Sequence, residues 1–206
     1  MEKDYKIFQK YFPPMAVEYC FTLWSNLKFK FKITQHRNSK LGDYSYSTHR
    51  GHNITINHNL NPYSFLVTYI HEVAHMITFQ EYKGNALPHG IEWKRNFLKT
   101  FLPILNSEVL PETLLQALTN YLKNPKASSL ADPKLVIALR VYDTICDTAN
   151  QENTSIELNQ LPLGTNFKIG NRLFSKGELR RTRYLCTDLT SNKKYLITSL
   201  ALVKKV

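Results

Sequence analysis

The sequence predicts an α+β fold in two parts. Three observations favour it: a stretch of strict apolar and polar alternation, several long apolar runs with helix caps, and a change to short β-rich runs near the carboxyl end. We expect a first domain over residues 1–150, with a small antiparallel sheet and several helices, and a small β-meander or barrel over residues 155–206. The polar stretch 148–155 is the expected linker.

The predicted sheet begins with a strand over residues 27–34. Its odd-numbered residues are apolar and alternate with Lys28, Lys30 and Lys32. Because successive side chains of a strand point to opposite faces, one face belongs to the core and the other is wet and positive. Two further strands are expected over 44–48 and 53–57, with turns at 42–43 and 50–52.

Helical signals dominate the middle of the chain. Asn61 is a good N-cap and Pro62 suits the first position of a helix that stays largely apolar to Tyr82, where Gly84 supplies a stop. The other expected helices cover residues 15–24, 91–102, 111–123 and 132–147.

The composition excludes several classes of protein. The chain has 206 residues, of which 43% are hydrophobic, with only 7 Gly and 9 Pro, so it is not disordered or collagen-like. Its three cysteines lie far apart and form neither a disulfide framework nor a cysteine zinc ribbon, which suits a reducing compartment. The amino terminus is charged and no 18-residue apolar run occurs. We therefore expect a soluble, cytoplasmic protein without a membrane partner.

The sequence His71-Glu72-Val73-Ala74-His75 is an H-E-x-x-H motif inside the strongest predicted helix. Residues four apart lie on the same face of a helix, so the imidazoles of His71 and His75 are close enough to share a Zn²⁺ ion. Glu72 then lies beside the metal, where a carboxylate can handle the proton of a water molecule. The motif predicts a catalytic zinc site.

A catalytic zinc ion usually has three protein ligands, so a third is needed. All other histidines lie between residues 36 and 89. We favour His89, because it follows the motif helix by one loop and Gly90 lets the backbone turn back before the next helix. The other candidates are His36, His49, His52 and His58, of which the last three are more typical of polar strand or loop residues.

Three segments together resemble the SprT-like zinc metallopeptidases: Ile54-Thr55-Ile56-Asn57, the H-E-x-x-H helix, and His89-Gly90-Ile91-Glu92-Trp93. Their order matches the strand, helix, loop and H-G-x-E-[FW] pattern of that family over about residues 1–105. The resemblance implies a zincin-like fold, with His71, His75 and His89 as zinc ligands and Glu72 as catalytic base. It also implies a protein or peptide substrate, and family members such as Spartan digest proteins crosslinked to DNA. This chain lacks the four-cysteine zinc ribbon of one common family arrangement.

The expected reaction is peptide hydrolysis, in which Glu72 takes a proton from the attacking water. A second donor to the carbonyl oxygen is usual, and the preceding strands offer Tyr44, Tyr46, His49 and His52, although each also suits a structural role. Glu92 is a candidate to orient a ligand, or a solvated carboxylate at a helix start.

Charge concentrates in the last quarter of the chain. The formal net charge is +11, and residues 155–206 carry ten Lys and Arg against three acidic residues. Lys and Arg bind phosphates, and the neighbouring Tyr184 and Tyr195 suggest stacking on unpaired bases, so we expect DNA or another nucleic acid as a partner. A solvated face or a protein partner is the alternative. The candidate residues are Lys28, Lys30, Lys32, Arg180, Arg181, Arg183, Lys193 and Lys194.

Two classes of function therefore follow from the sequence. The first is a zinc metallopeptidase that a basic module brings to nucleic acid. The second is a nucleic-acid-binding or protein-binding protein whose zinc site is structural or catalytically silent. Glu72 favours the first, because a purely structural zinc site has no use for a carboxylate at that position.

Overall fold

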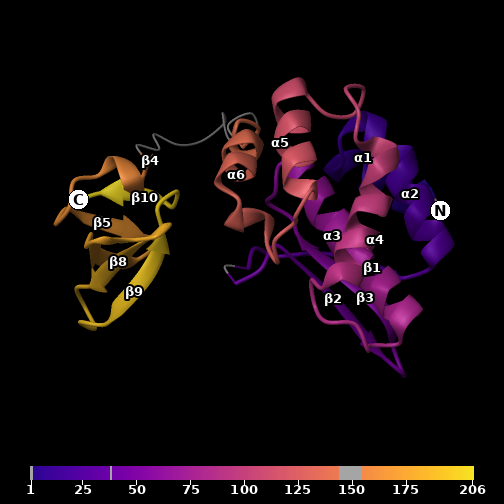
Figure 1. Ribbon diagram of the computed structural model, residues 1–206, viewed down its shortest axis with the longest axis horizontal. Coiled ribbons are helices and arrows are strands. Elements are labelled where there is room, and N and C mark those ends of the chain that lie inside the picture. Colours follow the sequence, from indigo (N-terminus) through magenta and orange to yellow (C-terminus); the bar gives the residue numbers. More distant parts are fainter. Residues whose placement is uncertain (1, 38, 144–154) are drawn as a thin grey trace. The chain divides into compact units, whose positions relative to one another are not determined.

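The computed structural model describes residues 2–37, 39–143 and 155–206 and has an α+β architecture (Figure 1). The chain divides into two compact units, Met1–Thr148 and Ala149–Val206. The first unit is mainly helical and the second is built from strands. The expected linker lies outside the described residues, apart from Ser155 at its end.

Two helices open the amino-terminal unit. The helix α1 (Glu2–Tyr11), which the sequence pattern did not predict, buries Phe8, and a 3₁₀ turn (Pro14–Ala16) leads into α2 (Val17–Leu27). Lys28 ends α2 in the left-handed conformation, at φ 55°, and its N–H donates to the carbonyl of Trp24. The predicted strand is therefore wrong at its start, because Lys28 is a helix cap and not part of a positive strand face.

The first unit contains a three-stranded sheet in the order β1-β3-β2, with β1 at Lys30–Thr34, β2 at Gly42–Ser47 and β3 at Gly51–Asn57. The hairpin β2–β3 is antiparallel, but β1 pairs parallel to β3, so the expectation of a wholly antiparallel sheet is wrong. The central place suits β3, because its side chains Ile54 and Ile56 are fully buried. The turns predicted at 42–43 and 50–52 lie largely within strands.

The long helix α3 (Pro62–Tyr82) forms as the sequence predicts. The side chain of Asn61 accepts hydrogen bonds from the backbone N–H groups of Tyr63 and Ser64, which satisfies two donors at the helix start. Lys83 and Gly84 end the helix with positive φ angles of 50° and 83°. No helix in the described parts of the chain combines the length and the apolar character that crossing a bilayer requires.

The remaining helices cover the core. They are α4 (Ile91–Phe101), α5 (Glu112–Leu122) and α6 (Pro133–Arg140), with 3₁₀ turns at Leu102–Ile104 and Ser129–Ala131. The helix α4 lies along α3 (Figure 1) and buries Trp93, Phe97 and Phe101, which are spaced four residues apart on one face. The predicted end of α6 at residue 147 lies outside the described residues.

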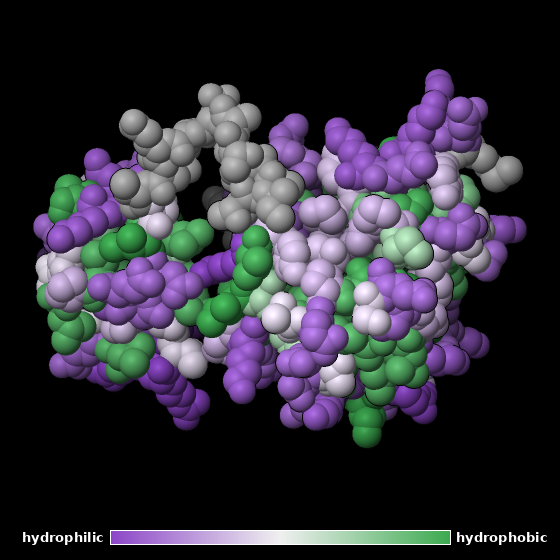
Figure 2. All heavy atoms as spheres, turned by 90° about the horizontal axis from the view of Figure 1, so that it is seen from above, coloured by the Kyte–Doolittle hydropathy of each residue, from purple (hydrophilic) through white to green (hydrophobic). Residues whose placement is uncertain are grey.

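The carboxyl-terminal unit is a β-structure around a small core. Its strands are β4 (Ser155–Glu157), β5 (Asn166–Ile169), β6 (Arg172–Ser175), β7 (Leu179–Arg180), β8 (Arg183–Asp188), β9 (Lys194–Thr198) and β10 (Leu202–Lys205). They follow the order β4-β10-β5-β6-β8-β7, and β9 also pairs with β8. Buried side chains such as Phe167, Phe174 and Cys186 fill the interior. Exposed leucines interrupt the hydrophilic surface of this unit (Figure 2).

Candidate metal centre

Three histidine side chains converge in the amino-terminal unit. His71 and His75 project from α3 one turn apart, and His89 reaches them from the loop before α4. The Nε2 atoms are separated by 3.1 Å between His71 and His75, 3.0 Å between His75 and His89, and 3.2 Å between His71 and His89. Each residue thus offers one nitrogen to a common point, as a metal site requires.

The size of this triangle fits a zinc ion. Nitrogen ligands of a tetrahedral zinc, at Zn–N distances of about 2.0–2.1 Å, lie roughly 3.3–3.4 Å from one another. Three imidazoles cannot satisfy one another at such distances, because each neutral ring directs a lone pair or a single proton toward two neighbours. A cation at the centre satisfies all three. Among the described residues the group has three members, which leaves a tetrahedral ion one open position.

Burial keeps the histidines in the form that binds metals. Burial, together with the neighbouring His75 and His89, lowers the pKa of His71 to about 3, and burial together with His89 lowers that of His75 to about 4. Burial also lowers the pKa of His89. The three rings are therefore neutral at pH 7, with lone pairs free for coordination.

The indole of Trp93 supports the three imidazoles. Its ring centroid lies 4.7 Å from that of His71, 5.3 Å from that of His75 and 4.7 Å from that of His89. Trp93 is fully buried, its indole N–H donates to the carbonyl of His71, and Phe97 stacks on its other side. The motif around His89 contained Trp93, but only the packing of α4 on α3 reveals that it holds the rings in place.

The loop that carries His89 is a tight turn. His89 has a φ of 58°, in the left-handed region that few residues with a side chain adopt. Gly90 donates its N–H to the carbonyl of Leu87, and a Cβ atom at Gly90 would lie 3.0 Å from that oxygen. A side chain at residue 90 would therefore crowd the Leu87 carbonyl, and glycine avoids this close approach in the turn that directs His89 toward α3.

Glu72 lies buried under the start of β2. A Cβ atom at Gly42 would lie only 2.7 Å from Glu72 Oε1 and 2.6 Å from Thr68 Cγ2, so only glycine lets the strand pass this close. The backbone N–H of Tyr44 donates to the Glu72 carboxylate. Burial, with a contribution from Asp43, raises the pKa of Glu72 to about 8 in the absence of a cation.

These groups line a cleft of about 350 Å³. One wall is the segment 39–44, the floor comes from α3 and His89, and residues 127–129 close the other side. The strand β2 is an edge strand, since only β3 pairs with it among the described residues. The carbonyl of Leu41 accepts from Asn57 and the N–H of Tyr44 turns to Glu72, so Gly42, Tyr44 and Tyr46 direct backbone groups to the free edge.

The other predicted histidines lie away from the centre. His36 and His58 are exposed, and His49 lies in the turn between β2 and β3. The Nδ1 atom of His36 lies 3.2 Å from Asn59 Oδ1, and that of His52 lies 2.9 Å from the Tyr44 hydroxyl. None of these four joins the triangle.

The candidate oxyanion donors separate in the same way. Tyr44 lines the cleft, but its hydroxyl contacts His52. Tyr46 and His52 pack with Phe79 in a different pocket. Glu92 lies in the first turn of α4, and within the described chain no hydrogen bond joins it to the three histidines. Its place is that of a carboxylate at a helix start, and a role in orienting a ligand stays a prediction.

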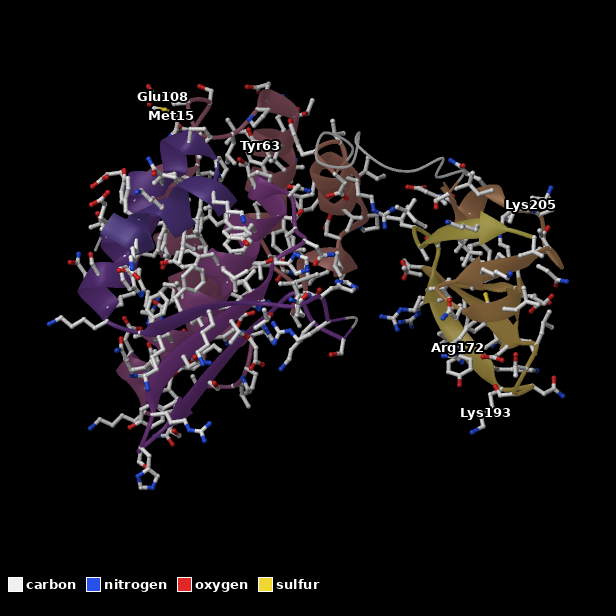
Figure 3. The ribbon with its side chains drawn as sticks, turned by 180° about the vertical axis from the view of Figure 1, so that it is seen from behind. Met15, Tyr63, Glu108, Arg172, Lys193 and Lys205 are labelled. Carbon is white, nitrogen blue, oxygen red and sulfur yellow. The ribbon has the colours of Figure 1, made fainter. Side chains whose placement is uncertain are left out.

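Within the carboxyl-terminal unit the predicted basic residues form two separate groups. Lys30 and Lys32 are exposed on β1. In the carboxyl-terminal unit, Arg180, Arg181 and Arg183 surround the turn between β7 and β8, whereas Lys193 and Lys194 lie at the turn between β8 and β9. The register pairs Arg183 with Thr198 and Thr187 with Lys194, so the two groups lie at opposite ends of the β8–β9 hairpin. Figure 3 shows Arg172 and Lys193 at the same end of this unit.

Cations of this unit lie over the rings of its two tyrosines. The ammonium of Lys176 lies 3.8 Å above the Tyr184 ring, and the guanidinium of Arg172 lies 4.4 Å above the Tyr195 ring. Both rings also pack against the core of the unit. Lys176 and Arg172 thus occupy positions over these rings that a base would need, and base stacking by Tyr184 and Tyr195 stays a prediction.

Comparison of the chain with protein-family models, with curated proteins and with solved structures gives no match. What the cleft can do therefore has to follow from its own geometry.

Proposed function

We propose that the amino-terminal unit is a zinc-dependent endopeptidase of the SprT-like kind, with the zincin-like fold that the resemblance implies. The observation that carries this proposal is the convergence of three neutral imidazoles beside a buried carboxylate, at the free edge of a sheet. A structural zinc site usually has four protein ligands, whereas this group has three in the described chain. The open position favours catalysis over a silent site.

Each residue has a defined part in the proposed reaction. His71, His75 and His89 would hold the zinc ion, which when bound polarises a carbonyl group and makes water more acidic. Glu72 would accept a proton from the attacking water and pass it to the leaving amine. Gly42 and the N–H of Tyr44 hold the Glu72 carboxylate in one position for both transfers.

The free edge of β2 favours an extended peptide as the substrate. Backbone groups of Gly42, Tyr44 and Tyr46 face that edge, next to the cleft. An added strand would pair through its main chain, which recognises peptides with little dependence on sequence. This suits a peptidase that acts on unfolded segments of many proteins. The charge of the second unit, together with the resemblance, supports proteins bound or crosslinked to nucleic acid as the substrate class.

The test is cleavage of an unfolded protein such as casein by the zinc-loaded chain, with metal content measured on the same sample. Glu72→Gln is expected to keep zinc and to lower turnover by about a hundredfold or more. Glu108→Gln is the matched control, because its carboxylate is exposed and remote from the cleft. Unchanged hydrolysis in Glu72→Gln, or a zinc-loaded chain that cleaves nothing, would exclude the proposed peptidase.

A further inference from the structure

The turn between β7 and β8 carries an unusual concentration of arginine. Arg180 and Arg183 are directly opposite one another in the register, and Arg181 occupies the two-residue turn between them. All three side chains are exposed. Like charges directly opposite one another on neighbouring strands destabilise a sheet. The stability of this hairpin therefore does not explain why arginine occupies these positions.

The backbone of the turn supports the same conclusion. Arg181 has a φ of 58°, a conformation for which two-residue hairpin turns favour glycine, asparagine or aspartate. An arginine at this position is less favourable for the fold than glycine. Strain of this kind is retained where a side chain is needed for another purpose.

No acidic partner neutralises these arginines. Throughout residues 2–37, 39–143 and 155–206, no carboxylate lies within ion-pair distance of Arg180, Arg181 or Arg183. Arg172 of the same unit is different, because Asp188 accepts hydrogen bonds from its guanidinium. The three hairpin arginines thus present free guanidinium groups, whose planar donors match phosphate oxygens.

Within the described residues of the unit, no aromatic ring is fully exposed for stacking on bases. Its aromatic residues are Phe167, Phe174, Tyr184 and Tyr195, and all four belong to its core or pack against it. Stacking on bases is what normally gives a protein its preference for single strands. A surface that has guanidinium groups but no free ring contacts the phosphate backbone alone.

We infer that the β7–β8 hairpin is a phosphate clamp that binds the backbone of nucleic acid without reading bases and without distinguishing single from double strands. Nucleic acid fits better than an anionic membrane, because membrane-surface binding favours an amphipathic helix, and the described part of this unit has only a 3₁₀ turn at Leu158–Gln160. The inference is independent of the peptidase proposal, since binding needs no hydrolysis.

The test is fluorescence anisotropy of the full chain with a labelled 20-base-pair duplex and with one of its strands, over a series of salt concentrations. The chain should bind both with similar affinity. Replacing all three arginines by glutamine should weaken binding about tenfold or more at low salt. It should also reduce the slope of log K against log salt by about 2.7 on the duplex and about 2.1 on the single strand, for three lost phosphate contacts.

Two further variants separate the clamp from general charge and from misfolding. Lys193→Gln with Lys194→Gln removes charge from the far end of the β8–β9 hairpin and should weaken binding less than the arginine variant. Arg181→Gly suits the positive φ, so it should preserve or raise stability while it weakens binding.

Several results would overturn the inference. They are an unchanged affinity and salt slope after the triple arginine replacement, full binding by Arg181→Gly, binding of the single strand alone, and binding of phosphatidylserine vesicles but not of DNA.

Discussion

The two units of the chain use their charged and polar side chains in opposite ways. In the amino-terminal unit, His71, Glu72 and His75 lie on one buried helix, where burial shifts their pKa values. In the carboxyl-terminal unit, Arg180 and Arg181 are exposed at the tip of a hairpin. Groups that carry out chemistry have to be desolvated and held in place, whereas groups that attract a polyanion act through water.

The hydrophobic cores of the two units also differ, and the core of the amino-terminal unit is the larger. A large cluster rich in aromatic rings surrounds α3, and its member Trp93 contacts the His89 ring. In the described part of the second unit, the core cluster has six buried residues, namely Leu158, Leu161, Phe167, Phe174, Cys186 and Val203. We therefore expect polar contacts such as that between Arg172 and Asp188 to contribute to its stability. We therefore expect variants of the first unit to change mainly turnover and zinc binding, and variants of the second to change mainly stability and recognition.

The largest effect is expected from loss of one imidazole. His75→Ala removes a nitrogen that lies within 3.1 Å of its two neighbours, so the variant should lose most of its bound zinc and all measurable turnover. Metal analysis and the casein assay check both. His58→Ala is the matched control, because His58 is exposed and should keep both properties. Full zinc occupancy in His75→Ala would show that the triangle is not the metal site.

Gly42→Ala should have the next largest effect. The added methyl group meets Thr68 and the Glu72 carboxylate within 2.7 Å, so it has to displace one of them. We expect kcat/KM to fall by about a hundredfold while zinc is retained, because small misplacements of a catalytic group are costly. Ser45→Ala, an exposed position of the same strand, should remain active. Equal activity of the two variants would exclude a role for the β2 approach.

Much of the helical framework could be predicted, because its signals are local. Asn61 and Pro62 at the start of α3, and Gly84 after its end, act through neighbouring backbone groups. The parallel pairing of β1 with β3 could not be predicted, since it depends on packing between segments that are distant in the sequence. Lys28 continued a perfect alternation but became a helix cap, because α2 extends to Leu27 and packs there.

The residues of the site also divide into those that local signals predict and those that depend on contacts between distant segments. The spacing of His71 and His75 is a property of one helix, and the loop to His89 is short, so the three imidazoles were predictable as a group. The sequence predicts a turn at Gly42. Its contact with Glu72 joins segments thirty residues apart, so local signals do not reveal it. The positions of Lys176 and Arg172 above the rings of Tyr184 and Tyr195 could not be predicted, because they depend on contacts between different strands.

A smaller effect is expected at the residue that anchors the cleft wall. Asn57 is fully buried and donates to the carbonyls of Arg37 and Lys40 at 3.1 and 2.9 Å, while its oxygen accepts from the Arg37 guanidinium. Asn57→Asp keeps the acceptor and loses both donated bonds, so the segment before Gly42 should loosen. We expect kcat/KM to fall by about tenfold at unchanged zinc content.

The matched control is Asn53→Asp on the same strand, because among the described residues the Asn53 side chain makes one long hydrogen bond, to Ser45 at 3.5 Å. It should stay within about twofold of the wild type. If Asn57→Asp were as active as this control, the hydrogen bonds from Asn57 to the carbonyls of Arg37 and Lys40 would not be needed to position the 39–44 wall of the cleft.

The smallest effect concerns the second unit and its dependence on pH. Backbone N–H groups of Ser191 and Thr190, together with the guanidinium of Arg172, lower the pKa of Asp188 to about 2, from an ordinary value of 3.8. A lowered pKa in the folded state stabilises the fold above the ordinary value, and this contribution is lost as the pH falls toward 2. Relative to an unstructured chain at the same pH, the β8 amides of the full chain should therefore lose protection against hydrogen exchange between about pH 4 and pH 2.

Asp188→Asn should flatten this change, since an amide does not titrate in that range, while the amides of α3 serve as an internal reference in the same sample. The variant loses the charged contact to Arg172 at every pH, so its β8 amides should exchange faster than those of the wild type at pH 7. Identical pH profiles in the two proteins would mean that the small core, and not the Arg172–Asp188 contact, sets the stability of the second unit.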